Sequence, residues 1–189
     1  MPLFKIMKKF SVIVVLGLLF FGHANAEKRE LELNKLFNQL KNNSNTLMAF
    51  EIEMNIWNIC STHPSQKNLT QLLENGSNLI KKHKLIKAYE TFSKVISLDP
   101  NWAEGWNKRA TVLYMLGKYQ ESQEDINEVL KLEKRHFGAL SGQGMVQIEL
   151  KNYEKAINSY KEVQKIYPSM QTPKIIIPRL KELIKNESI

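Results

Sequence analysis

The feature that most constrains this chain is an internal repeat of 34 residues, which extends over more than half of its 189 residues. Aligning the sequence with itself at that offset gives three consecutive blocks, 69–102, 103–136 and 137–170. Small residues occupy the eighth and the twentieth position of every block, namely Gly76 and Ala88, Ala110 and Ser122, and Gly144 and Ala156. A repeat of this length is a unit that cannot bury its apolar face alone, so the chain must form a stacked array.

Apolar spacing within a block predicts two helices. Two sets of residues in the second block share the spacing i, i+4 and i+7, which places each set on one face of a helix. The sets are Trp106, Ala110 and Leu113, and then Ser122, Ile126 and Val129. A turn at Gly117 separates them. Each block therefore predicts a helical hairpin whose apolar face is covered by its neighbour.

The repeat length, the small residues at the eighth and twentieth positions and the tyrosines at the seventeenth, Tyr119 and Tyr153, resemble the tetratricopeptide repeat. The resemblance covers residues 69–170. It implies an all-α fold, namely a right-handed α-solenoid of helical hairpins with three repeats, without strands, and with a helical cap at each end.

Each block also carries a polar residue at its seventh position and another sixteen residues later, on the partner helix. These pairs are Asn75 and Thr91, Arg109 and Asp125, and Gln143 and Ser159. We expect the two side chains of each pair to meet across the hairpin. Arg109 and Asp125 are predicted to form a structural ion pair, and ligand binding by Arg109 is the alternative interpretation.

The segments that flank the repeats predict capping helices. Residues 27–68 contain two amphipathic sets of apolar residues and are predicted to form an N-terminal helical hairpin that caps the array. The sets are Leu33, Leu36, Phe37 and Leu40, and then Leu47, Phe50, Met54 and Trp57. Residues 171–189 are predicted to contain a C-terminal capping helix. We expect it to start near Pro178, because proline inside a helix removes a hydrogen bond and clashes with the preceding turn.

Residues 1–26 have the organisation of a secretory signal peptide. Three lysines and no acid precede an uncharged apolar run over residues 10–21, and small residues at 24 and 26 indicate cleavage after Ala26. This run would rise about 18 Å as a helix, short of the roughly 30 Å hydrocarbon core of a bilayer. We therefore expect a periplasmic or secreted protein that begins at Glu27. An uncleaved segment anchored to the inner membrane is the alternative.

The positive charge of the chain does not indicate nucleic-acid binding. The formal charge of +8 falls to +5 without the three lysines of the first 26 residues. The run Lys81-Lys82-His83-Lys84 lies in one turn, whereas nucleic-acid-binding surfaces combine basic and aromatic residues in a stripe. We expect no nucleic-acid partner, and weak contact of this run with a membrane surface stays open.

The chain lacks the residue combinations of catalytic and metal sites. Cys60 and His63 are two potential metal ligands, but tetrahedral zinc requires about four. A nucleophilic cysteine needs a positioned base, and the spacing to His63 provides no sign of one, so we expect Cys60 to be a buried, inert thiol. His83 and His136 are isolated and fall in predicted turns. We predict no enzyme activity, no metal and no cofactor.

The resemblance implies a non-catalytic protein-interaction module. In tetratricopeptide proteins the first helix of each repeat lines a concave groove that holds a partner segment. The corresponding residues are Asn107, Lys108, Thr111, Tyr114, Met115, Ser141 and Met145. The chain resembles small exported repeat proteins of Gram-negative bacteria, so we expect a protein or peptide partner in the cell envelope. Two alternatives stay open: terminal helices that fill the groove, and a scaffold subunit that docks on an envelope complex through its convex face or caps.

One activity of the family is not expected here. Family members that grip the C-terminal carboxylates of chaperones use lysine, asparagine and arginine at fixed positions of their three repeats. The residues at those positions are Leu73, Ser77, Lys108, Gly138 and Gly142. Because Lys108 is the one basic residue among them, the sequence predicts that the carboxylate clamp is absent.

Overall fold

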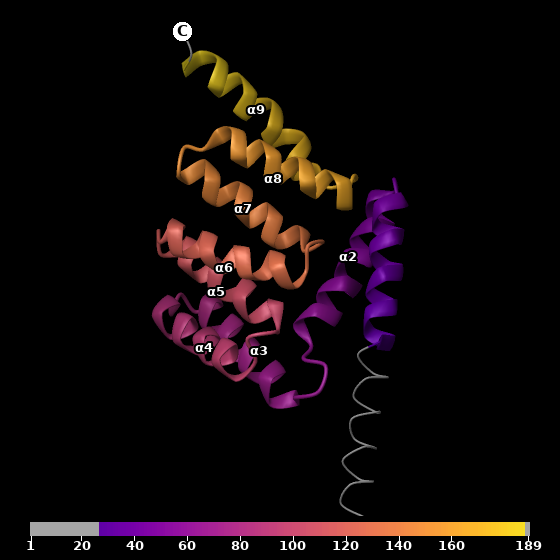
Figure 1. The fold of residues 1–189 in the computed structure, drawn as a ribbon, viewed down its shortest axis with the longest axis vertical. Helices are drawn as coiled ribbons and strands as arrows, with labels where there is room; N and C mark the ends of the chain where they lie inside the picture. The colour runs from indigo at the N-terminus through magenta and orange to yellow at the C-terminus, as the bar shows by residue number, and fades with distance from the viewer. Residues whose placement is uncertain (1–26, 188–189) are drawn as a thin grey trace, which may run out of the picture.

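The computed structural model describes residues 27–187, which form helices joined by short turns, with no strand among them. The first helix spans residues 27–42. The helices that follow are α2 (Thr46–Ser61), α3 (Lys67–Lys81), α4 (Leu85–Leu98), α5 (Ala103–Met115), α6 (Tyr119–Leu132), α7 (Phe137–Glu149), α8 (Tyr153–Ile166) and α9 (Gln171–Glu187). The predicted signal peptide and its cleavage site at Ala26 lie outside the described residues. The prediction of an all-α solenoid of helical hairpins is confirmed (Figure 1).

Three hairpins form the solenoid, α3 with α4, α5 with α6, and α7 with α8 (Figure 1). Each hairpin turns at a residue in the left-handed region, His83 with φ 55°, Gly117 with φ 73° and Lys151 with φ 58°. The amide that follows each of these residues donates to the carbonyl five residues before it, which satisfies the end of the first helix. Because the three turns are alike, successive hairpins can stack in the same orientation.

The two helices of a hairpin approach closely where the repeat places glycine. In the first repeat the ring of Phe92 lies on Gly76, where an added Cβ would stand 2.5 Å from Cε1 of the ring. In the third repeat Tyr160 lies on Gly144, with a corresponding distance of 2.6 Å to Cε2. Both rings are buried. The small residues of the repeat pattern are therefore sites of direct contact between the helices of a pair.

The last helix begins earlier than the sequence predicts. α9 starts at Gln171 and contains Pro178, so the prediction of a helix start near Pro178 is wrong. The proline removes one backbone donor from the helix. Its neighbours Ile177 and Leu180 are buried against α8, and burial of such a side chain contributes about 1.5–3 kcal/mol. This packing offsets the local cost of the proline.

The N-terminal hairpin does not stack on the first repeat, as the predicted end cap would. We call the helix over residues 27–42 together with α2 the edge hairpin. It runs along one side of the solenoid, from the level of α3 to the level of α8 (Figure 1). Its buried residues, including Leu40 and Ile56, share one apolar cluster with Phe137 and Tyr167 of the third repeat. The edge hairpin therefore packs against the loops at the ends of the repeats.

The first of these loops, between α4 and α5, is held by two hydrogen bonds. His63 lies just beyond α2, and its Nε2 is 2.8 Å from the carboxylate of Asp99. The Nδ1 atom of the same ring accepts from two backbone amides, so Nε2 carries the proton and donates it to Asp99. The indole of Trp102 donates to the carbonyl of Cys60 at 2.9 Å. His63 is therefore a structural residue.

The other two loops contact the body of the edge hairpin. In the loop between α6 and α7, His136 packs edge-on against Trp57 of α2, with ring centroids 5.4 Å apart, and Phe137 at the start of α7 does so at 5.3 Å. In the same loop the guanidinium of Arg135 lies 4.4 Å from the centre of the Phe37 ring. Between α8 and α9, the hydroxyl of Tyr167 donates to Glu53 at 3.0 Å. The edge hairpin thus contacts all three loops that follow a repeat.

The opposite edge of the solenoid carries the turns within the hairpins. Lys81, Lys82, His83 and Lys84 are all exposed there, between α3 and α4. Across residues 27–187, the structure contains no helix with the length and apolar character needed to span a membrane.

We expect two glycines of α7 to respond in opposite ways to alanine. Gly144→Ala places a methyl group 2.6 Å from the buried Tyr160 ring, so the helices must separate at a cost of about 1–3 kcal/mol. Gly142→Ala brings a Cβ within 3.7 Å of Ile126, an ordinary contact. It also removes the entropic cost of glycine in a helix, for a gain of about 0.5–1 kcal/mol.

Urea denaturation followed by circular dichroism measures the free energy of unfolding of both variants. Gly142→Ala is the matched control for Gly144→Ala, because both substitutions add the same atom to the same helix. A Gly144→Ala protein as stable as the parent would contradict the close approach of α7 and α8.

Candidate functional site

A small hollow of about 80 Å³ lies between α5 and α7, two first helices of the repeats, and residues of α6 complete its wall. Its lining residues are Asn107, Ala110, Thr111, Tyr114, Ser122, Ile126, Gly138, Ala139, Gly142 and Met145. Four of the seven predicted groove residues are among them: Asn107, Thr111, Tyr114 and Met145. The structure therefore brings part of the predicted groove together around one cavity.

The polar side chains that line this hollow differ in their burial and in their hydrogen-bond partners. Asn107 is buried, and its Nδ2 donates to Glu104 at 3.2 Å. Thr111 is exposed and donates to the backbone carbonyl of Asn107. The hydroxyl of Tyr114 donates to Glu149 at 3.2 Å. Partial burial, together with the charge of Glu149, raises the pKa of Tyr114, so its hydroxyl stays protonated.

The other three predicted groove residues do not line the hollow. Lys108 pairs with Glu104 at 3.1 Å, and its ammonium lies 5.7 Å from the centre of the Trp57 ring. Ser141 directs its hydroxyl at the sulfur of Met170, 4.0 Å away. Met115 is exposed at the end of α5. The edge hairpin thus covers the end of the groove at Lys108. This partly agrees with the alternative that terminal helices fill the groove.

The two glycines that line the hollow differ in whether the packing around them requires glycine. At Gly138 an added Cβ would collide with Cη2 of Trp57, so the close approach of α2 requires glycine. At Gly142 an added Cβ would meet only Ile126, at 3.7 Å. The packing of the described residues therefore accounts for Gly138 and does not account for Gly142.

A buried carboxylate supports this end of the groove, and no repeat position of the sequence points to it. Glu104 has 1% of its surface exposed, and its oxygens bond His136 and Lys108 at 3.2 and 3.1 Å. Burial alone would raise the pKa of Glu104, but the hydrogen bond from His136 and the charge of Lys108 outweigh it and lower the pKa. His136 also accepts the amide of Ala139 at Nδ1, so its Nε2 donates to Glu104. Glu104 and His136 are 32 positions apart in the sequence. Spacing within a helix therefore could not predict that they pair.

The predicted polar pairs form in two of the three hairpins. The guanidinium of Arg109 binds both oxygens of Asp125, at 2.8 and 2.7 Å. Its remaining contacts are also internal, since it bonds Ser93 and lies 5.0 Å from the centre of the Trp106 ring.

In the third repeat the hydroxyl of Ser159 donates to Gln143 at 2.9 Å. In the first repeat the hydroxyl of Thr91 instead donates to the carbonyl of Lys87 on its own helix. The expectation that Asn75 and Thr91 meet is therefore wrong. Because threonine can satisfy its hydroxyl within the helix, it does not need a partner across the hairpin.

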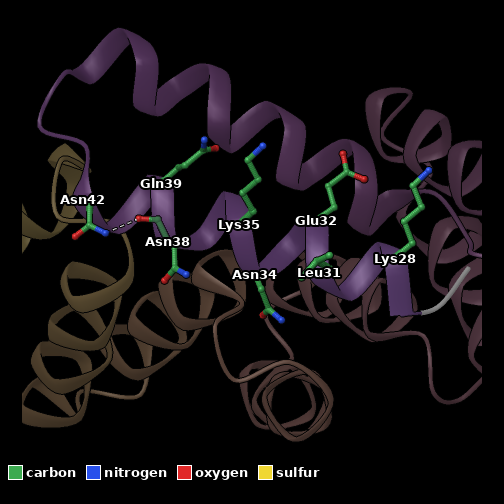
Figure 2. Close-up of a pocket in the computed structure, with 8 residues that line it drawn as sticks. All are labelled: Lys28, Leu31, Glu32, Asn34, Lys35, Asn38, Gln39 and Asn42. Atoms are coloured by element: carbon green, nitrogen blue, oxygen red, sulfur yellow. Dashed lines mark hydrogen bonds between the residues drawn. The ribbon is translucent and has the colours of Figure 1, made fainter. Parts of the chain in front are cut away.

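A larger hollow, of about 1070 Å³, runs along the outer face of the helix over residues 27–42. Figure 2 shows that its labelled residues all come from this one helix. They are Lys28, Leu31, Glu32, Asn34, Lys35, Asn38, Gln39 and Asn42. Asn42 bonds the carbonyl of Asn38, and Asn34 bonds Arg135. All the lining residues come from one helix, and those with printed partners bond within the fold, so we do not treat this face as the functional site.

Cys60 is half-buried, and burial raises the pKa of its thiol to about 12, with the charge of Glu104 adding to the effect. Within residues 27–187 no group of three or more histidine, cysteine or acidic residues is arranged to hold a metal ion. His63 is bonded to Asp99. The structure thus does not combine Cys60 and His63 into a site.

We expect Cys60 to react slowly with iodoacetamide while the protein is folded. At pH 8 a thiol with the ordinary pKa of about 8.5 is partly ionised, whereas one with a pKa of about 12 is almost fully protonated. Labelling of the folded protein should be at least about a hundredfold slower than labelling of the urea-unfolded chain. Mass spectrometry measures both rates, and equal rates would contradict the raised pKa.

The comparisons with known sequences match the repeat region. The tetratricopeptide repeat family matches residues 103–136 and again residues 139–169. A TPR repeat-containing protein of Rhizobium etli is 32% identical over 143 residues, covering 74% of this chain and 68% of that protein. Hsp70-Hsp90 organizing protein 3 of Arabidopsis thaliana is 29% identical over 98 residues, covering 52% of this chain and 18% of that protein. This chain therefore spans about two thirds of the first relative and less than a fifth of the second.

Solved structures are similar in fold. The first TPR of Spaghetti, bound to the HSP90 peptide SRMEEVD, matches with a TM-score of 0.60 and 21% identity, covering 62% of this chain and 93% of that one. The Sgt2 TPR domain from Aspergillus fumigatus matches with a TM-score of 0.61 and 16% identity, covering 65% of this chain and 83% of that one. At these identities the likeness concerns the arrangement of the helices.

Proposed function

Because the chain belongs to the tetratricopeptide repeat family of protein-interaction modules, we propose that it binds a partner protein segment in the groove between α5 and α7. The observation that carries this proposal is the hollow that brings Asn107, Thr111, Tyr114 and Met145 together. Apolar pockets with a few polar groups are typical of sites that hold a partner segment. We propose no catalytic activity of its own.

The expected site of action is the bacterial cell envelope. Residues 1–26 support this by their sequence, which has the basic start, apolar run and small-residue cleavage site of a signal peptide. The partner would then be an exported protein or the exposed segment of a membrane protein.

Photo-crosslinking in cells tests the groove. A crosslinking residue at Thr111 or Met145, both on the hollow, should capture the same partner protein. The control position is Leu132, which is exposed at the end of α6 and is absent from the hollow. Gly142→Leu should abolish capture from Thr111 because the added side chain occupies the hollow. It should leave the circular dichroism spectrum unchanged, because an added Cβ makes only an ordinary contact, with Ile126 at 3.7 Å.

Capture from Leu132 instead of Thr111 would contradict the groove and favour a scaffold subunit that docks through its convex face. Capture from Thr111 that persists in the Gly142→Leu protein would also contradict it.

Export is tested separately by the mass of the protein recovered from the cell envelope. We expect a polypeptide that starts at Glu27, because the cleavage site lies after Ala26. A mass that includes Met1 would contradict the cleaved signal peptide and would support an uncleaved anchor.

A further inference from the structure

An apolar row on α2 continues from the edge of the groove. Trp57 lies at that edge, against Gly138 and next to the ammonium of Lys108. Met54 and Phe50 precede Trp57 by three and seven residues, so they lie on the same side of α2, one and two turns away. Both are more than half exposed, Phe50 at 54% and Met54 at 51%. Scattered exposed apolar residues are ordinary, but this row leads to Trp57, which packs on Gly138, a lining residue of the hollow.

The hollow itself contains two features that the described part of the chain leaves unexplained. Glycine within a helix costs about 0.5–1 kcal/mol relative to alanine, and no packing contact requires it at Gly142. Asn107 is 9% exposed and lines the hollow. Its Nδ2 donates to Glu104, while its Oδ1 accepts no hydrogen bond from the described residues. A nearly buried asparagine with a free acceptor atom therefore lies on the wall of an unfilled space.

The charges of the groove indicate the chemistry of what fits there. Lys108 is the one basic residue among the predicted groove residues, and Glu104 already neutralises it. Tyr114 likewise donates to Glu149. An incoming carboxylate would therefore have to displace a formed ion pair, whereas an aliphatic side chain would displace only water.

We propose that the partner is an uncharged, extended segment that lies between α2 and α7. One aliphatic side chain of the segment enters the hollow at Gly142, and a backbone N–H donates to Oδ1 of Asn107. Further apolar side chains cover Phe50 and Met54. This inference rests on the proposed function. It adds α2 as a second wall of the groove, and it specifies that the bound segment is uncharged.

Selection of random peptides displayed on phage, with the purified protein as target, tests the chemistry of the occupant. We expect the enriched peptides to carry aliphatic residues and few acids, and to bind equally well at low and high salt. The acidic HSP90 peptide SRMEEVD should not compete with them. Enrichment of acidic peptides whose binding weakens with salt would overturn the proposal.

Variants of the protein test the position of the occupant, with fluorescence anisotropy of the most enriched peptide as the measurement. Gly142→Leu should abolish binding, and the double substitution Phe50→Ser with Met54→Ser should weaken it at least about tenfold. Met48→Ser is the matched control, because Met48 is equally exposed at 54% but lies on the other side of α2. It should bind like the parent.

The outcomes separate this inference from the function it rests on. If the peptides lose binding to the Gly142→Leu protein but still bind the double variant, α2 is not part of the binding site. The groove between α5 and α7 would then still be the site. Failure to enrich any peptide sensitive to Gly142→Leu would overturn the groove itself.

Discussion

The arrangement of the solenoid depends on places where a helix packs directly on the backbone of its partner. Phe92 on Gly76 and Tyr160 on Gly144 are two of them. In the middle repeat the contact is polar, because the hydroxyl of Ser122 donates to the carbonyl of Ala110 at 2.8 Å. This spacing within each pair positions α5 beside α7, and the hollow between them follows from that placement. A larger side chain at any of these positions would separate the helices on which the site is built.

The site also depends on a buried ionic network at the end of α5. Glu104 is a carboxylate withdrawn from solvent, and such a group is tolerated only when its partners are in place. Its partners come from its own helix and from His136 in the next loop. Through Lys108 and Trp57 the network reaches the edge hairpin. The orientation of Asn107 is thus coupled to segments outside the repeats.

The repeat pattern predicts what lies within one repeat and says little about what lies between distant ones. The hairpins and the pair of Arg109 and Asp125 follow from fixed spacings inside the 34-residue unit, and the structure contains both. The edge hairpin could not be placed, because its contacts with the loops have no period. The helix start near Pro178 was wrong because tertiary burial outweighed a local rule. Position along a helix likewise predicted Lys108 and Ser141 as groove residues without revealing that their side chains have internal partners.

The edge hairpin has a consequence for the order in which the chain can fold. In a simple repeat array each unit contacts only its neighbours, so units can form as they are synthesised. Here Glu53 bonds Tyr167, which follows it by 114 positions. The apolar faces of the edge hairpin therefore stay partly uncovered until the third repeat is available to pack against them. Once that repeat is present, the edge hairpin and the third repeat pack together. We therefore expect the described helices to unfold as one cooperative body instead of fraying unit by unit.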